Sequence, residues 1–174
     1  MRFIDFVIGK TMMFYTIDTD EPALKGKLIY HVQDHSFDFE PESLVTLQQR
    51  VGFVGTTSLL INSMQLEVGI ETGILLYVWG YYPRYHWKQA KLSPPSPCVG
   101  MIRAGLESPF EEGISISIEP MIQWTTHYDS SSGWICIGDS TIPPTHEPIE
   151  FATFVIAVIE KTNLHALWLH PAFE

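Results

Sequence analysis

The sequence predicts a mainly β protein, built either as an antiparallel two-layer sandwich or as a barrel-like sheet of about nine strands with one short helix. Apolar and polar residues alternate with a period of two in many short segments, which is typical of strands with one buried face. Clusters of turn-forming residues separate these segments. With 174 residues, of which 45% are hydrophobic, the chain is long enough to bury its own core. We therefore expect a single globular domain spanning residues 1–174.

The first part of the chain is expected to hold three short strands and the helix. Strands are predicted at residues 3–8, 12–17 and 28–32, which lie between turn-prone residues. Across residues 41–51, apolar side chains instead recur at Leu44, Leu47 and Val51, which is a helical spacing. Pro41 opens this segment and Gly52 follows it, as is typical of helix ends. The same residues also alternate weakly, as in a strand, but we favour the helix.

The rest of the chain is expected to form three hairpins. The first joins residues 59–69 to residues 74–82 through a turn that ends at Gly73. The second joins residues 114–124, in which Ile114, Ile116 and Ile118 alternate with polar residues, to residues 134–138. The third joins residues 151–159 to residues 164–170. Proline-rich runs at residues 93–97 and 142–145 permit neither strand nor helix, so we expect ordered surface loops there.

The charge of the chain limits its partners. Twenty Asp and Glu residues outnumber ten Lys and Arg residues, which gives a net charge of −10. The excess is concentrated in residues 92–174, where ten acidic residues accompany only Arg103 and Lys161. Such a surface disfavours nucleic acid and anionic membranes and suits a basic protein partner. No apolar stretch is long enough to span a bilayer, no signal peptide is expected, and the two cysteines lack CxxC spacing. These features predict a cytoplasmic protein.

Known catalytic motifs are incomplete in this sequence. Residues 9–11 (Gly-Lys-Thr) resemble the end of a phosphate-binding loop but lack its first glycine, and no Gly-x-Ser-x-Gly motif occurs. His31 and His35 are the best candidates for a metal site, because acidic residues follow them closely. A predicted bend between them leaves their convergence open. In the last predicted strand, His165 and His170 fall on opposite faces. We expect no cofactor.

The most informative feature is a run of aromatic residues. On a straight strand, Tyr77, Trp79 and Tyr81 point the same way, while Leu76 and Val78 point to the other face. One interpretation is a core rich in rings. The alternative is an aromatic-lined groove for a small organic ligand, a sugar or a peptide. The candidate ligand-binding residues are Tyr77, Trp79, Tyr81, Arg84, Tyr85 and Trp87.

These observations favour a non-enzymatic binding or interaction protein, for example an acidic, inhibitor-like or immunity-like protein that covers a basic partner. A small-molecule-binding β-barrel or sandwich, with the aromatic residues lining its pocket, is the second hypothesis. A metal-assisted enzyme that uses His31, His35 and a carboxylate is the third. We also expect self-association as a homodimer, through a sheet edge or face.

Overall fold

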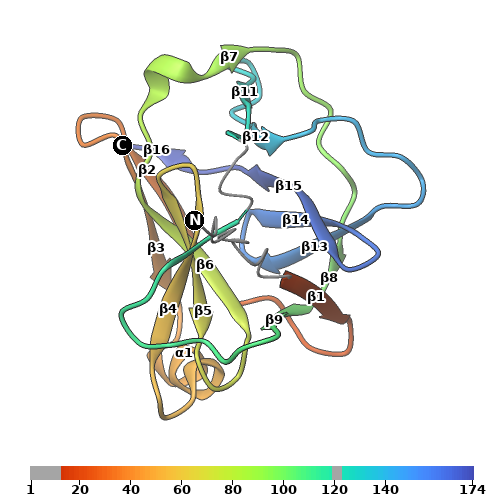
Figure 1. Cartoon of the computed structure of the whole chain (residues 1–174). Coiled ribbons are helices and arrows are strands. Elements are labelled where there is room, and N and C mark those ends of the chain that lie inside the picture. Colours follow the sequence, from red (N-terminus) through yellow and green to blue (C-terminus); the bar gives the residue numbers. More distant parts are fainter. Residues whose placement is uncertain (1–12, 119–122) are drawn as a thin grey trace, which may run out of the picture.

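The computed structural model describes residues 13–118 and 123–174, and its architecture is two β-sheets that share one core. Each sheet has seven strands and neither closes on itself, while β1 and β9 pair as a separate two-stranded ribbon (Figure 1). The mainly β prediction is therefore confirmed, although the described residues form 16 strands rather than about nine. The strand expected at residues 3–8 lies outside the described residues.

The two sheets have different strand orders. The first runs β10-β4-β5-β6-β3-β2-β16. Its strands are β2 (Gly26–His31), β3 (Ser36–Pro41), β4 (Thr56–Ile61), β5 (Met64–Gly69), β6 (Leu75–Tyr81), β10 (Ile116–Ser117) and β16 (Ala172–Phe173). The second runs β7-β11-β12-β15-β14-β13-β8. Its strands are β7 (Lys88–Gln89), β8 (Cys98–Val99), β11 (Thr126–Tyr128), β12 (Ile135–Gly138), β13 (Glu147–Ala152), β14 (Val155–Glu160) and β15 (Asn163–Leu169). The ribbon pairs β1 (Met13–Asp18) with β9 (Met101–Leu106).

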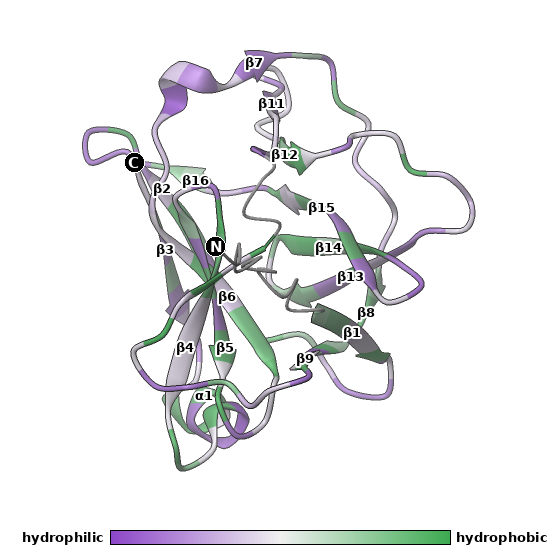
Figure 2. Ribbon diagram, in the orientation of Figure 1, coloured by the Kyte–Doolittle hydropathy of each residue, from purple (hydrophilic) through white to green (hydrophobic). Residues whose placement is uncertain are grey.

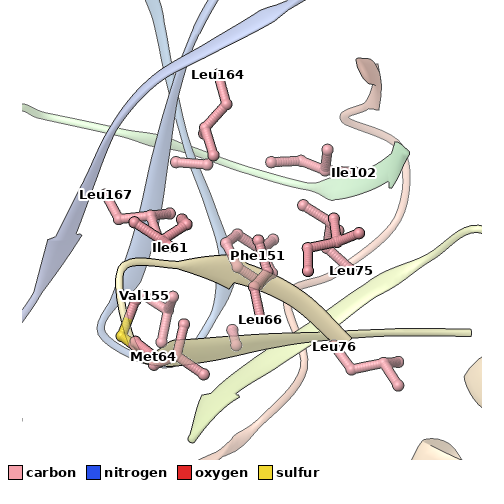
Figure 3. Close-up of a cluster of buried hydrophobic side chains, with 14 of the residues drawn as sticks. Ile61, Met64, Leu66, Leu75, Leu76, Ile102, Phe151, Val155, Leu164 and Leu167 are labelled. Carbon is pink, nitrogen blue, oxygen red and sulfur yellow. The ribbon is translucent and has the colours of Figure 1, made fainter. Parts of the chain in front are cut away.

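The main core lies where the inner faces of the two sheets meet. Figure 3 shows Leu66 of the first sheet, Phe151 of the second and Ile102 of the ribbon gathered in one cluster. All three side chains are fully buried. The strands that supply this core, such as β6 and β14, carry much of the hydrophobic colour in Figure 2. A second, smaller apolar cluster, which includes Trp168 and Leu92, covers part of the second sheet.

The predicted helix is confirmed as α1 (Leu44–Val51). Ser43 caps it, because its hydroxyl accepts a hydrogen bond of 3.2 Å from the backbone N–H of Thr46. Leu47 and Val51 pack against the main core, as the helical spacing requires. This helix has eight residues, and no described helix has the length and hydropathy to cross a membrane.

The first predicted hairpin is confirmed only in part. Residues 59–69 contain the end of β4 and all of β5, which pair with each other around a tight turn at Asn62 and Ser63. Asn62 has a φ of +53°, a left-handed conformation that asparagine tolerates better than most residues. The second arm forms as expected, because β5 pairs antiparallel with β6.

The other two hairpins differ more from the prediction. Of residues 114–118, only Ile116 and Ser117 form a strand, and it pairs in parallel with β4 instead of with β12. β12 instead pairs antiparallel with β11, which lies nearer in sequence, and with β15 on its other side. The third hairpin is confirmed as β14 and β15, but Phe151 and Ala152 belong to the preceding strand, β13.

Both sheets have very short strands at their edges. The edge strands β10, β16, β7 and β8 have two residues each, and each pairs in parallel with its neighbour. Residues 90–97, which we call the proline strap, join β7 to β8. The strap therefore connects opposite edges of the second sheet (Figure 1).

Candidate metal centre

Four polar residues lie in a row across one end of the second sheet. Gly138 of β12 pairs with Ala166 of β15, which places the residue after Gly138, Asp139, beside His165. In the same way, Glu147 pairs with Ile159, so His146 lies beside Glu160. Because β12, β15, β14 and β13 are neighbours in this order, the row follows the sheet from Asp139 through His165 and Glu160 to His146.

A β-bulge determines where His165 lies. Val158 pairs with Ala166, but the next residue of β14, Ile159, pairs with Leu164, so His165 is an extra residue on β15. The prediction that His165 and His170 occupy opposite faces assumed a regular strand, and the bulge removes the basis of that argument. Bulges commonly redirect a side chain at a functional site, and this one occurs at His165.

Three side chains of the row converge closely enough to share one ion. The potential ligand atoms of His146, Glu160 and His165 all lie within 4.8 Å of one another. Nε2 of His146 is 3.2 Å from Oε2 of Glu160, and the two imidazole rings stack with their centroids 4.2 Å apart. Nε2 of His165 is also 3.6 Å from Oδ2 of Asp139. Among the described residues, this is the only such group of three.

His146 is buried and His165 is half-buried, and both have buried ring nitrogens without a hydrogen bond in the described part of the chain. The side chain of His146 is only 5% exposed, yet neither of its ring nitrogens forms a hydrogen bond within the described part of the chain. The same is true of Nε2 of His165, so the short distances to the carboxylates do not have hydrogen-bond geometry. A buried polar atom without a partner is costly and calls for a partner such as an ion or a water molecule. The side chain of Glu160, by contrast, is 45% exposed, so one side of the cluster is open to solvent.

Local backbone geometry holds the row in place. The N–H of His146 donates to the carbonyl of Pro143 at 2.9 Å, which closes a turn with Pro144 at its second position. Asp139 accepts a hydrogen bond of 2.9 Å from the N–H of Thr141. That bond is the main reason that the pKa of Asp139 is lowered, and His165 lowers it further. Asp139 is therefore ionised next to His165 at neutral pH.

A pocket opens beside the exposed end of the row. It has a volume of about 490 Å³, and both Asp139 and His165 line it. The wall also includes Trp124, His127 and Ser140. This combination of an apolar surface and a few polar groups is typical of small-molecule sites. A ligand in the pocket would therefore reach the carboxylate of Asp139 and the imidazole of His165.

The structure does not bring a third ligand to the histidines that the sequence suggested. His31 ends β2, and His35 lies in the turn before β3 with a φ of +52°. The ring of His35 contacts those of Tyr81 and Tyr85. Among the described residues, no group of three potential ligand atoms includes either histidine.

The predicted aromatic residues occupy three different environments. Tyr77 stacks on Phe39, with ring centroids 5.5 Å apart, and Trp79 donates a hydrogen bond of 2.7 Å to Glu67. Tyr81 and Tyr85 are exposed and joined through their hydroxyl groups. None of these residues lines the pocket beside His165 and Asp139.

Arg84 and Trp87 form the third environment. Trp87 packs against the main core, where its ring contacts Tyr30 and Tyr128. The guanidinium of Arg84 lies 5.5–5.8 Å from the ring centroids of Trp87, Tyr128 and Phe173. This arrangement is a cation–π contact within the protein, so Arg84 has its own aromatic partners.

The sequence could not have indicated His146, Glu160 and His165 as a set. They are separated by 14 and 5 positions, so no short motif contains them. Only the strand register and the bulge bring them together. No protein-family model, curated protein or solved structure matches this chain.

Proposed function

We propose that this protein binds a divalent transition-metal ion, preferably zinc, through His146, Glu160 and His165, and that the ion helps to hold a small ligand in the adjacent pocket. The observation that carries the proposal is His146, a buried histidine whose ring nitrogens form no hydrogen bond with the described residues and which faces a carboxylate and a second imidazole. Imidazole and carboxylate are preferred ligands of zinc.

The observed distances suit ion binding after a small contraction. Zinc holds its ligands at about 2.0–2.2 Å, so tetrahedral ligand atoms lie about 3.3 Å apart. The atoms of the cluster are within 4.8 Å of one another, and modest side-chain rotations therefore suffice. Two histidines and one glutamate leave a fourth position free. That position can be filled by water or by a ligand from the pocket that Asp139 and His165 line.

Zinc titration of the purified, chelator-treated protein tests this proposal. We expect calorimetry to show one ion per chain, and Co²⁺ to give the absorption bands of a tetrahedral site. His146→Ala and His165→Ala should each weaken zinc binding by about a hundredfold, since even outer partners of metal ligands contribute ten- to a hundredfold. Zinc at about 100 times its Kd should also raise the free energy of unfolding by about 2.7 kcal/mol.

Glu147→Gln is the matched control for Glu160→Gln. Glu147 is exposed and adjacent to His146 in sequence, but its carboxylate is not part of the cluster. We expect Glu160→Gln to weaken zinc binding and Glu147→Gln to leave it unchanged. Equal affinities of these two variants, or no zinc binding by the wild type, would exclude the proposed site.

An exposed apolar face on α1 and the residues that follow it supports protein interaction as a second candidate function. Leu44, Val45 and Val54 are mostly exposed, and Phe53 is fully exposed. A shallow groove runs between several of these residues and Gln48. Apolar side chains clustered in this way on a protein surface mark contact sites. The acidic composition of the chain suits a partner with basic residues around an apolar centre.

A further inference from the structure

The proline strap crosses the second sheet at nearly its full reach. Seven strands at about 4.8 Å give a sheet about 29 Å wide. Nine residue steps separate the last residue of β7, Gln89, from the first residue of β8, Cys98, and they span about 28 Å at the rise of a polyproline II helix. The two lengths agree, so the strap has little slack.

The residue types of the strap enforce this extended form. Pro94, Pro95 and Pro97 have a fixed φ, and a residue that precedes a proline is pushed towards extended backbone. Ser93 and Ser96 are both in that position. Within the described part of the chain, residues 93–97 form no hydrogen bond, which is the normal state of a polyproline II backbone.

The strap turns one side towards the sheet and the other towards solvent. Leu92 is buried against the second apolar cluster, and Pro95, three positions later, is half-buried. Ser93, Pro94 and Ser96 are exposed. A polyproline II helix has three residues per turn, so the ridge of Leu92 and Pro95 faces the sheet while the other two ridges face outward.

The basic residue of the strap lies on one of the outward ridges. Lys91 and Pro94 are exposed and three positions apart, and Pro97, which is half-buried next to β8, follows Pro94 by three. In a helix with three residues per turn, these three residues therefore form one ridge, with about 9 Å between successive members. The sequence of the strap is thus a basic residue followed by two prolines at regular spacing.

We propose that the proline strap is a docking site for an SH3-type domain. Such domains bind a polyproline II segment in an aromatic-lined groove that contacts two of its three ridges, and many also take up a basic side chain in an acidic pocket. Two ridges of the strap face solvent and are free to contact such a groove, while the third packs against the second sheet. Lys91, on an outward ridge, would enter the acidic pocket of the SH3-type domain. Because both ends are fixed by β7 and β8, the segment is already ordered before it binds.

The test is a titration of a ¹⁵N-labelled SH3 domain that selects Lys/Arg-x-x-Pro-x-x-Pro peptides with the intact protein. We expect chemical-shift changes confined to the aromatic groove and one-to-one binding. Pro94→Ala should weaken binding by roughly tenfold, because it removes a ring from the groove and loosens the helix. Lys91→Ala should weaken it by several-fold and make it less dependent on salt.

Lys25→Ala is the matched control for Lys91→Ala, since Lys25 is an exposed lysine outside the strap, and it should bind within about twofold of the wild type. Circular dichroism and thermal unfolding verify that each variant is folded. A synthetic peptide of residues 88–99 completes the experiment. Binding of the peptide but not of the intact protein would show that the strap is inaccessible, and failure of both would show that its sequence does not fit the groove. Either result overturns the proposal.

Discussion

At the scale of single residues, the two cysteines have opposite environments. Cys98 is exposed on the edge strand β8, whereas Cys136 is fully buried in β12. Burial raises the pKa of the Cys136 thiol to about 12, with a smaller contribution from Asp139. The thiolate is the reactive form, so Cys136 is protected both by its low accessibility and by its protonation.

We therefore expect one thiol to react in the native protein. A disulfide reagent at pH 8 should label Cys98 within minutes and Cys136 only after unfolding in denaturant. Mass spectrometry of the labelled protein gives the count, and Cys98→Ser provides the control, with no rapid labelling. Rapid labelling of both native thiols would contradict the burial of β12.

Asp129 should make stability depend on pH in the acidic range. The hydroxyl of Ser131 and backbone N–H groups, including that of Leu92, donate to its carboxylate and hold its pKa far below the usual range. A group whose pKa is depressed in the folded state stabilises the fold above its unfolded pKa of about 3.9 and loses this effect as the pH falls towards the folded value. The wild type should therefore exceed Asp129→Asn in stability at pH 6.

The difference in the free energy of unfolding between the wild type and Asp129→Asn should shrink as the pH falls from about 5 to about 2. Urea unfolding of both proteins across this range measures it. Because Asp129 also bonds to the first buried residue of the proline strap, Leu92, the variant should loosen the strap as well. A difference between the two proteins that does not change with pH would show that the carboxylate is not involved.

At the scale of elements, Gly138 allows β12 to end beside the proposed metal site. Its φ is +108°, and a Cβ atom there would lie 2.8 Å from both the carbonyl oxygen of His165 and the ring of Trp124. Contacts of this length force the neighbours to move. The glycine thus allows the bulged strand and the wall of the pocket to approach each other closely.

Gly138→Ala should destabilise the protein by more than the cost of placing an alanine at a positive φ, because the added Cβ atom would also be too close to its neighbours. Gly55→Ala is a matched control, because Gly55 has a φ of +107° and a Cβ atom added there would have no neighbour within 4 Å. We expect a cost of about 1–3 kcal/mol for the control and a clearly larger one at Gly138. Chemical denaturation of both variants gives the difference, and equal costs would mean that the close contacts at Gly138 are easily relieved.

The sequence predicts elements better than it predicts their partners. The alternation and the end signals correctly indicated the helix and the hairpin of β14 and β15. The turn at Asn62 was missed because the residues on both sides continue one apolar pattern, and Asn-Ser is a weaker turn signal than Asn-Gly. The strand at Ile116 pairs with β4, more than 50 residues away, which alternation cannot reveal. The proposed metal site likewise depends on strand pairing, because the register of β13, β14 and β15 brings His146, Glu160 and His165 together.

At the scale of the whole molecule, the apolar face on α1 is the strongest candidate for contacts between molecules. The sheet edges are short strands, which limits pairing between the edges of two molecules. The expected homodimer would then form through the face around Leu44 and Phe53, both of which are largely exposed.

Leu44→Glu/Phe53→Glu should convert such a dimer to a monomer, as measured by light scattering. Leu44 is the first residue of the helix, where a negative charge is favourable, so the substitution should not weaken α1. Phe154→Glu serves as the control, since Phe154 is exposed on a turn of the second sheet. A dimer that survives the double substitution would place the interface elsewhere.

The short edge strands also have a consequence for the time course of folding. The strand pairs β4–β5 and β14–β15 join segments that are neighbours in sequence, whereas β10, β16, β7 and β8 join segments that are far apart. Pairings across long stretches of chain form late, because loop closure must be completed first. We therefore expect the four short edge strands to be the last to pair, so that a newly made chain exposes the edges of both sheets until they do. The short edge strands would then limit edge-to-edge pairing of the folded protein but not of partly folded chains.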